Sequence, residues 1–453
     1  MQRPWPLLEF APTNLTILTL DLRVSTFGVM TTPAEQPPIQ AIKQLNLPPY
    51  ETFMLSNGMP VYILNGGSEP VMRIEVVFKA GATTEIKPGV AEFMAGLLSE
   101  GTQKMSSVEL AEHIESRGAT VQTRGGVDTV RIRLFTLTRF LPELLEAIID
   151  VIEIPAFDPG ELKVYAENKV ERLQIELKKN EVLAYRHLTE VIFGKTHPYG
   201  KNLKKKDYLS ITSEDLRYHH VHNVLPDRGM VFISGSLGGK EIESIQQTLG
   251  QWKPISPNGL SLPKLPEPRK KAVYREITAP QSHQASIRIG RKLFSQRHPD
   301  FNGLILLNTI LGGYFGSRLM AEIRENKGLT YGIYSSIDSF AEDGCIYIST
   351  ETATDNVEAV ITAIKGEVQR LRTEPVSEAE LDMARNYLMG HIMTQLDGPF
   401  ASMDFIKSMK IERLDDSHFQ QMIMTLQSLT AEDIRQLAEQ YLNLEEWSTI
   451  VVK

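Results

Sequence analysis

The sequence predicts an α+β fold built twice, as a tandem repeat of two homologous α/β sandwich domains. In each domain we expect an antiparallel-rich sheet with helices on one face. Three observations carry this prediction: two pairs of similar segments at a nearly constant offset, a shared order of strands and helices in both halves, and a proline-rich stretch between the halves.

The similar segments lie about 219 residues apart. The helical stretch "FDPGELKVYAENKVERLQIEL" matches "EPVSEAELDMARNYLMGHIM", in which Glu161 aligns with Glu380 at an offset of 219. Further along, "LSITSEDLR" matches "LQSLTAEDIR", in which Thr212 aligns with Thr430 at an offset of 218. Two independent matches at nearly one offset indicate a duplication.

The order of elements can be followed along the first half. Apolar runs and alternation predict strands in "PVYILN" and "IEVVFKAG", a buried helix at 89–99 and a helix in "SVELAEHIESRG". The strands "ATVQTRG" and "TVRIRLF" and paired helices over 141–193 should follow. In both halves Thr212 or Thr430 begins a capping signature before an amphipathic helix, which leads into a terminal strand, "MVFISGS" or "STIVVK".

The stretch "WKPISPNGLSLPKLPEPRKK" separates the halves, and its five prolines forbid regular structure. We therefore expect domains at 46–250 and 271–453, joined by a linker at 251–270. Residues 1–45 should form an extension with little fold.

Composition narrows the class of protein. The 453 residues are 42% hydrophobic and 23% charged, as in a globular protein, and the net charge of −8 argues against a nucleic-acid partner. No apolar run reaches the ~18 residues of a membrane span. A single cysteine, Cys345, excludes an internal disulfide and favours a reduced compartment, so we expect a cytoplasmic protein, with the periplasm as the alternative. The sequence leaves open a start at Met1 or Met30.

One predicted helix keeps a regular buried face but lacks a full set of reactive side chains at the positions where they would be expected. In "GVAEFMAGLLSEGT", residues 89–102, the apolar side chains recur at the spacing of a buried helical face. Between them, at turn-related positions where a reactive cluster would share one face, stand Glu92, Ala95 and Gly96.

With these residues the chain resembles the M16 peptidase family, which includes insulinase and mitochondrial processing peptidase, over roughly residues 45–453. It is most similar to the short two-domain branch, which implies the fold of the LuxS/MPP-like metallohydrolases. The family pattern Gly-x-x-His-x-x-Glu-His-x-x-x-x-Gly-Thr supplies two zinc ligands and a general base from one helix face. Gly89, Gly101 and Thr102 match the frame of this pattern.

The reactive positions do not match. Ala95 and Gly96 offer neither ligand nor base, and one carboxylate at Glu92 cannot replace two imidazoles. The family's third ligand is a glutamate about 75 residues downstream, where Glu171 stands between Glu167 and Glu176. A lone glutamate there is more typical of a solvated helix. We therefore expect no metal in this chain.

The second half keeps a different part of the family pattern. "GGYFGSRLMAEIRENKGLTYGIYSS" resembles the segment in which an arginine and a tyrosine seven residues apart hold the substrate backbone and scissile carbonyl. Arg324 and Tyr331 have this spacing. Gly328 should end the helix that carries Arg324, and Tyr331 should enter the following strand. The alternative is a surface charge and a half-buried strand aromatic.

Two further segments carry residues of types that can bind a peptide or a metal ion. The strand after Gly118 resembles the family segment that pairs with an extended peptide, which implies substrate-binding positions at Gly118, Ala119, Thr120 and Val121. The triplet in "YHHVHN", His219, His220 and His222, has no cysteine or carboxylate to complete a metal site, so we do not expect metal there.

A lost metal site with a retained Arg/Tyr pair is the pattern of the partner subunit in two-chain members of the family. We therefore expect a catalytically incomplete subunit of a heterodimeric M16-type zinc peptidase, inactive alone. It would supply Arg324 and Tyr331 to a partner that bears His-x-x-Glu-His and zinc and hydrolyses peptides. The alternatives are a non-catalytic scaffold, like the core subunits of the respiratory chain, and a self-associating, peptide-binding homodimer.

Overall fold

The computed structural model describes residues 42, 44–253, 265–266, 272–279 and 284–453. Most of the predicted extension at 1–45 and of the predicted linker at 251–270 lies outside these residues. In the described part of the chain, no helix has the length and apolar character needed to cross a bilayer.

The first half builds a six-stranded sheet with the order β1-β2-β6-β3-β5-β4. Its strands are β1 (Glu51–Met54), β2 (Pro60–Asn65), β3 (Val71–Phe78), β4 (Thr120–Gly125), β5 (Val130–Leu137) and β6 (Gly229–Gly235). All neighbouring strands are antiparallel except β2 and β6, which are parallel. Strand β4 is therefore an edge of this sheet.

The second half builds a five-stranded sheet with the order β7-β11-β8-β10-β9. Its strands are β7 (Tyr274–Ile277), β8 (Gln284–Leu293), β9 (Ile333–Ser339), β10 (Gly344–Ala353) and β11 (Ser448–Val452). Only β7 and β11 are parallel neighbours. The α+β class and the antiparallel-rich sheets predicted from the sequence are confirmed.

The helices follow the predicted order. The first half contains α1 (Val90–Leu97), α2 (Ser107–Glu115), α3 (Leu141–Glu153), α4 (Pro159–Glu176), α5 (Asn180–Phe193), α6 (Lys205–Leu209), α7 (Ser213–Asn223) and α8 (Gly239–Thr248). The second half contains α9 (Phe301–Asn308), α10 (Val357–Thr373), α11 (Glu378–Gln395), α12 (Gly398–Ile411), α13 (Asp416–Ser428) and α14 (Ala431–Tyr441). The capping boxes predicted at Thr212 and Thr430 are present, each with the aspartate three residues on.

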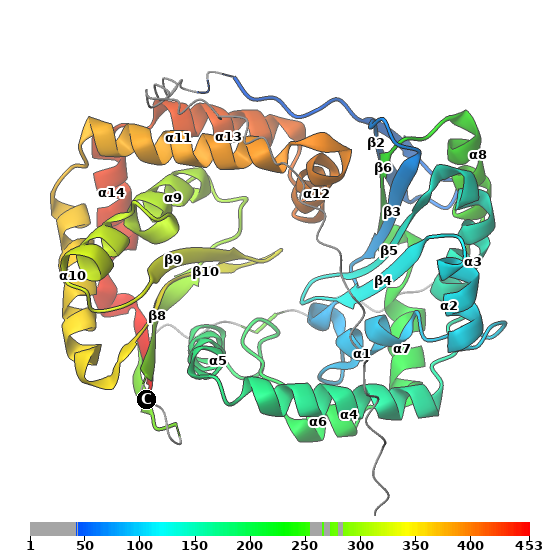
Figure 1. The fold of residues 1–453 in the computed structure, drawn as a ribbon, viewed down its shortest axis with the longest axis horizontal. Helices are drawn as coiled ribbons and strands as arrows, with labels where there is room; N and C mark the ends of the chain where they lie inside the picture. The colour runs from blue at the N-terminus through cyan, green and yellow to red at the C-terminus, as the bar shows by residue number, and fades with distance from the viewer. Residues whose placement is uncertain (1–41, 43, 254–264, 267–271, 280–283) are drawn as a thin grey trace, which may run out of the picture. The chain divides into compact units, whose positions relative to one another are not determined.

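One helix of each half packs on the sheet of the other half, which the sequence did not predict. Helix α12 lies against β2, β3 and β6 (Figure 1), on the face opposite the first half's own helices. Its Met403 and Ile406 pack with Val77, Met230 and Phe232.

Helix α5 makes the reciprocal contact with β8 and β11 of the second sheet. Its Ala184 and Leu188 pack with Tyr347 and Ile450. The two helices begin at Asn180 and Gly398, close to the offset of the repeat, so they are the same element of the two copies.

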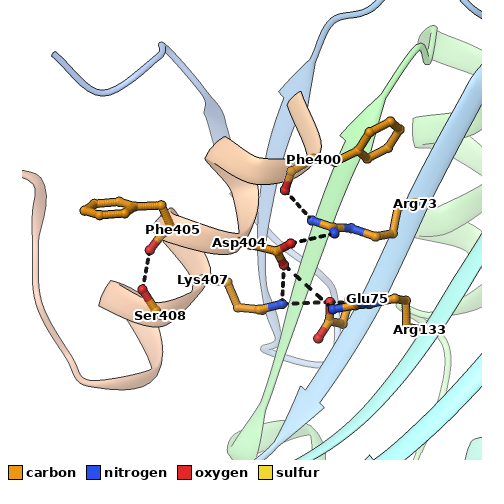
Figure 2. Close-up of polar contacts among 8 residues, drawn as sticks. All are labelled: Arg73, Glu75, Arg133, Phe400, Asp404, Phe405, Lys407 and Ser408. Carbon is orange, nitrogen blue, oxygen red and sulfur yellow. Dashed lines mark hydrogen bonds and ion pairs between the residues drawn. The ribbon is translucent and has the colours of Figure 1, made fainter. Parts of the chain in front are cut away.

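A buried ion network fixes α12 to the first sheet (Figure 2). On β3, Glu75 accepts from Lys407 Nζ at 2.9 Å and from Arg133 Nε at 3.0 Å. Arg73 donates to Asp404 at 2.8 Å and to the Phe400 carbonyl at 2.7 Å, and Lys407 also reaches Asp404 at 2.6 Å. The side chains of Glu75 and Lys407 are 1% and 6% exposed, so both buried charges depend on this network for neutralisation.

Candidate functional site

Helix α1 is the predicted degenerate metal helix, and glycines allow its position beside the edge strand. Gly89, before the helix, has φ +87°, in the left-handed region that favours glycine. A Cβ on Gly125 of β4 would lie 2.8 Å from the Ala91 carbonyl oxygen. The backbones of α1 and β4 therefore approach closely at this point.

A carboxylate anchors the start of α1. Glu85 accepts hydrogen bonds from the backbone N–H groups of Gly89, at 3.0 Å, and Ala91, at 3.2 Å. Burial raises the pKa of Glu85 to about 7, although these two hydrogen bonds act in the opposite direction. Near neutral pH this carboxyl is therefore partly protonated.

The first reactive position of α1 holds an ion pair. Glu92 accepts from Lys169 Nζ of helix α4 at 2.5 Å, and both side chains are largely covered. Burial acts to lower the pKa of Lys169, whereas the hydrogen bond and charge of the Glu92 carboxylate act to raise it. The net shift of the pKa is upward. The Glu92 carboxylate is thus already paired with the Lys169 ammonium group, and it would have to lose this partner in order to bind a metal ion.

The other two positions are filled without ligands. Ala95 is fully buried in the core. A Cβ built on Gly96 would overlap the phenol ring of Tyr165, also from α4, which packs edge-on against Phe93 with ring centroids 5.0 Å apart. A histidine at position 96 would collide with this ring, so the residues present do not fit a zinc ion.

The three glutamates near the expected position of the third ligand lie on different sides of helix α4. Glu171 and Glu167 are exposed, whereas Glu176 lines a cavity of about 400 Å³ beside Glu92 and Gly96. Glu176 accepts from Arg172 Nε at 3.0 Å. Within the described ranges, no group of three or more His, Cys, Asp or Glu side chains could hold a metal ion.

Arg324 lies in a π-helical segment, η5 (Met320–Asn326), a type of turn often found at functional sites. Its guanidinium stands 4.6 Å from the ring centroid of Phe315, which is itself exposed. Tyr331 is 92% exposed. Neither Arg324 nor Tyr331 forms a side-chain hydrogen bond or ion pair with the residues that the structure describes.

The prediction that Gly328 ends this helix is confirmed, because Gly328 has φ +61° and its N–H bonds the Arg324 carbonyl at 3.1 Å. The prediction that Tyr331 enters the next strand is wrong by two residues. Strand β9 begins at Ile333, so Tyr331 lies in the loop before the strand. Its backbone is therefore outside the hydrogen-bonded strand pairing.

The predicted peptide-binding strand is a sheet edge, as expected. Gly118 has φ +65° in the turn after α2, Ala119 is buried, and Thr120 and Val121 begin β4. The free side of β4 can accept an added strand. Pairing with a peptide at these four residues stays a prediction.

The histidine triplet of α7 serves packing. His219 Nε2 bonds the Ala80 carbonyl at 2.8 Å, and His220 Nε2 bonds the Ile152 carbonyl at 2.7 Å. Burial lowers the pKa of both imidazoles, that of His220 to about 4. His222 bonds its own helix at the Tyr218 carbonyl.

Two family models match the chain: the insulinase model of peptidase family M16 over residues 61–203, and the peptidase M16 inactive domain over residues 210–388. The chain is 23% identical over 395 residues to the uncharacterized zinc protease YmxG of Bacillus subtilis, covering 86% of this chain and 94% of that protein. It is 24% identical over 383 residues to the beta subunit of the mitochondrial-processing peptidase of Saccharomyces cerevisiae, covering 80% and 81%.

A third relative is the non-peptidase homolog YmxG of Helicobacter pylori, 23% identical over 329 residues, with 71% of this chain and 74% of that protein covered. The fold also matches the crystal structure of a protease from Helicobacter pylori with a TM-score of 0.83. That match has 18% identity and covers 90% of this chain and all of the other.

The chain therefore belongs to the M16 peptidase family, with the insulinase-type domain in its first half and the inactive domain in its second. The family predicted from the sequence is confirmed. The more specific assignment, to a subunit without a metal site, stays a prediction.

Sequence reasoning missed Tyr165 and Lys169. Both lie on α4 one turn apart, as i and i+4, and face α1. The spacing was available in the sequence. The rotation of α4 that selects this face, rather than that of Glu171, is set by packing.

Proposed function

We propose that this chain is the non-metal subunit of a heterodimeric M16-type zinc peptidase. Its partner would carry the zinc and the general base, and this chain would supply Arg324 and Tyr331 to the substrate carbonyl. The observation that carries the proposal is the contrast between the two sites. The Glu92 position is closed by its own ion pair, whereas Tyr331 is exposed and the half-buried Arg324 contacts only the Phe315 ring and forms no side-chain hydrogen bond or ion pair with the described residues.

The chemistry of the pair supports this role. A phenol and a guanidinium donate hydrogen bonds, and an oxyanion developing on a scissile carbonyl is stabilised by such donors. Among the residues that the structure describes, the Tyr331 hydroxyl has no hydrogen-bond partner to give up, and Arg324 rests on the Phe315 ring through a contact that leaves its N–H groups available. Because Ala95 and Gly96 offer no zinc ligand and Glu92 is paired with Lys169, we expect no peptidase activity from the chain alone.

The test uses the mixed dimer obtained by co-purifying the chain with an M16 subunit that contains His-x-x-Glu-His. Tyr331→Phe and Arg324→Ala should each lower kcat by about 10²–10³ while the dimer remains intact by size-exclusion chromatography. Tyr334→Phe, an exposed tyrosine on β9, is the control for the phenol. Arg139→Ala, which removes a similar stacked arginine above Phe140, is the control for the guanidinium.

Unchanged peptide cleavage by both Tyr331→Phe and Arg324→Ala dimers would refute the catalytic role. A second function would then take first place: a peptide-binding or scaffold protein without catalysis, alone or as a homodimer. The name of the Helicobacter pylori relative, a non-peptidase homolog, favours this second candidate.

A further inference from the structure

Two arginines lie directly opposite each other on neighbouring strands, one on the edge strand β4 and one on β5. The register of β4 and β5 pairs Arg124 directly with Arg131, so their side chains leave the same face of the sheet. Like charges directly opposite each other in a cross-strand pair are destabilising. Such a pair needs an anion, or it costs stability.

The protein supplies a partner for the next arginine but not for these two. Arg133, two residues along β5, donates to Glu75 and stands 3.8 Å from Asp404. Within the described ranges, neither Arg124 nor Arg131 has a side-chain hydrogen bond or ion pair, and the Arg131 Nε atom is buried without an acceptor. A buried donor left unsatisfied destabilises the folded protein.

On the Arg124 side, the neighbouring acids are already committed. Arg124 lines the 400 Å³ cavity that also contains Glu92 and Glu176. Glu92 is held by Lys169, and Glu176 by Arg172. Each of these two carboxylates already has its own cation, so neither needs the charge of Arg124.

On the Arg131 side, a second cavity of about 490 Å³ contains Asp128, Asp404 and Glu412. The Asp128 carboxylate accepts from the Tyr199 hydroxyl and the Ala341 N–H. Asp404 is bound by Lys407 and Arg73, and Glu412 accepts from Ser339 and Gln296. None of the three carboxylates hydrogen-bonds to Arg131.

We infer that Arg124 and Arg131 together bind the carboxylate of an acidic side chain in an extended peptide that adds to the free edge of β4. A strand paired with β4 places one side chain directly opposite Arg124, with Cβ atoms about 4.5–5.5 Å apart. From there a glutamate or aspartate reaches the Arg124 guanidinium, and the long Arg131 side chain can approach from the next strand. Charge-assisted bonds from arginine to a carboxylate are among the strongest hydrogen bonds in proteins.

This interaction would set specificity and register. Because side chains alternate across a strand, a one-residue slip moves an acidic residue to the other face, away from the arginines. The inference rests on the peptide-binding part of the proposed function and requires neither the zinc partner nor the Arg324/Tyr331 pair. It assigns the preferred substrate class as peptides with an acidic residue at one defined position.

The test measures binding of fluorescein-labelled peptides to the full chain alone by fluorescence anisotropy. A β-prone nonapeptide with a central glutamate is compared with the same peptide carrying glutamine or lysine there. We expect the glutamate peptide to bind about tenfold more tightly than the glutamine peptide, and the lysine peptide to bind most weakly. Arg124→Gln should remove the preference, so that the glutamate and glutamine peptides bind with similar affinity.

The control is Arg172→Gln, which removes the same charge from the same cavity but from an arginine already paired with Glu176. It should keep the preference. Arg131→Gln should also abolish the preference, and because Arg124 is exposed, the Arg124 variant decides the matter if Arg131→Gln folds poorly. Equal binding of the glutamate and glutamine peptides, an Arg124→Gln variant that keeps the preference, or no binding of any peptide would overturn the inference. The turnover test of Tyr331→Phe is independent of each of these results.

Discussion

Replacing Lys407 by methionine tests the ion network that holds α12 on the first sheet. The substitution keeps the aliphatic chain and removes an ammonium group that bonds Glu75 at 2.9 Å and Asp404 at 2.6 Å. Asp404 is 43% exposed and keeps Arg73, so its loss contributes little. Glu75 is 1% exposed and would retain only Arg133, while its Oε1 atom already has no partner.

Removing one partner of a buried ion pair typically costs about 3–5 kcal/mol. Because Arg133 still contacts Glu75, we expect the lower end, about 3 kcal/mol, for Lys407→Met. The assay is urea unfolding followed by circular dichroism, combined with hydrogen exchange across α12, where protection should fall first. Lys365→Met, at an exposed lysine of α10, should change the free energy of unfolding by less than about 0.5 kcal/mol.

A double variant separates charge from packing. Adding Glu75→Gln to Lys407→Met removes the stranded carboxylate, so the double variant should be more stable than Lys407→Met alone. A loss below about 1 kcal/mol for Lys407→Met, or no recovery in the double variant, would refute the idea that this network fixes α12.

Two further predictions concern α1. Installing the family's reactive residues by Glu92→His, Ala95→Glu and Gly96→His should not produce stoichiometric zinc binding, because Tyr165 fills the space beside position 96; one zinc per chain by metal analysis after dialysis would contradict this. Glu85 has a folded-state pKa of about 7, above the ordinary value of 4.5, so its contribution makes the folded protein less stable as pH rises from about 4.5 to about 7. Glu85→Gln should therefore raise the free energy of unfolding at pH 8 by about 1–2 kcal/mol and flatten this slope in urea titrations. An unchanged slope would show that folding does not raise the pKa of Glu85.

Local pattern was enough to predict the elements but not the exchange of helices. The apolar runs of β2 and β3 and the capping boxes at Thr212 and Thr430 are properties of a few neighbouring residues, and the structure follows them. The apolar residues Met403 and Ile406 predict that α12 has a buried face, but periodicity does not say which sheet covers that face. Only long-range packing assigns α12 to the first half's sheet.

At the candidate site the same limit applies on a smaller scale. The lack of a complete zinc-binding set at positions 92, 95 and 96 is visible in the sequence, but the groups that pack there, Tyr165 and Lys169, depend on the rotation of α4. That rotation turns Tyr165 and Lys169 toward α1 and Glu171 toward solvent. The position of Tyr331 differed by two residues because element boundaries depend on the hydrogen bonds of the neighbouring strand.

The contacts between α1 and α4 also bear on how the edge strand β4 is held in place. In a zinc enzyme of this family, the metal would cross-link the helix of the reactive motif to the helix that brings the third ligand. Here the Glu92–Lys169 pair and the Tyr165 ring against Phe93 link the same two helices, α1 and α4. Because α1 touches β4 at Gly125, this link keeps the edge strand in place. Lys169→Met should therefore loosen β4 as well as α1 in hydrogen exchange, and faster exchange confined to α4 would contradict the coupling.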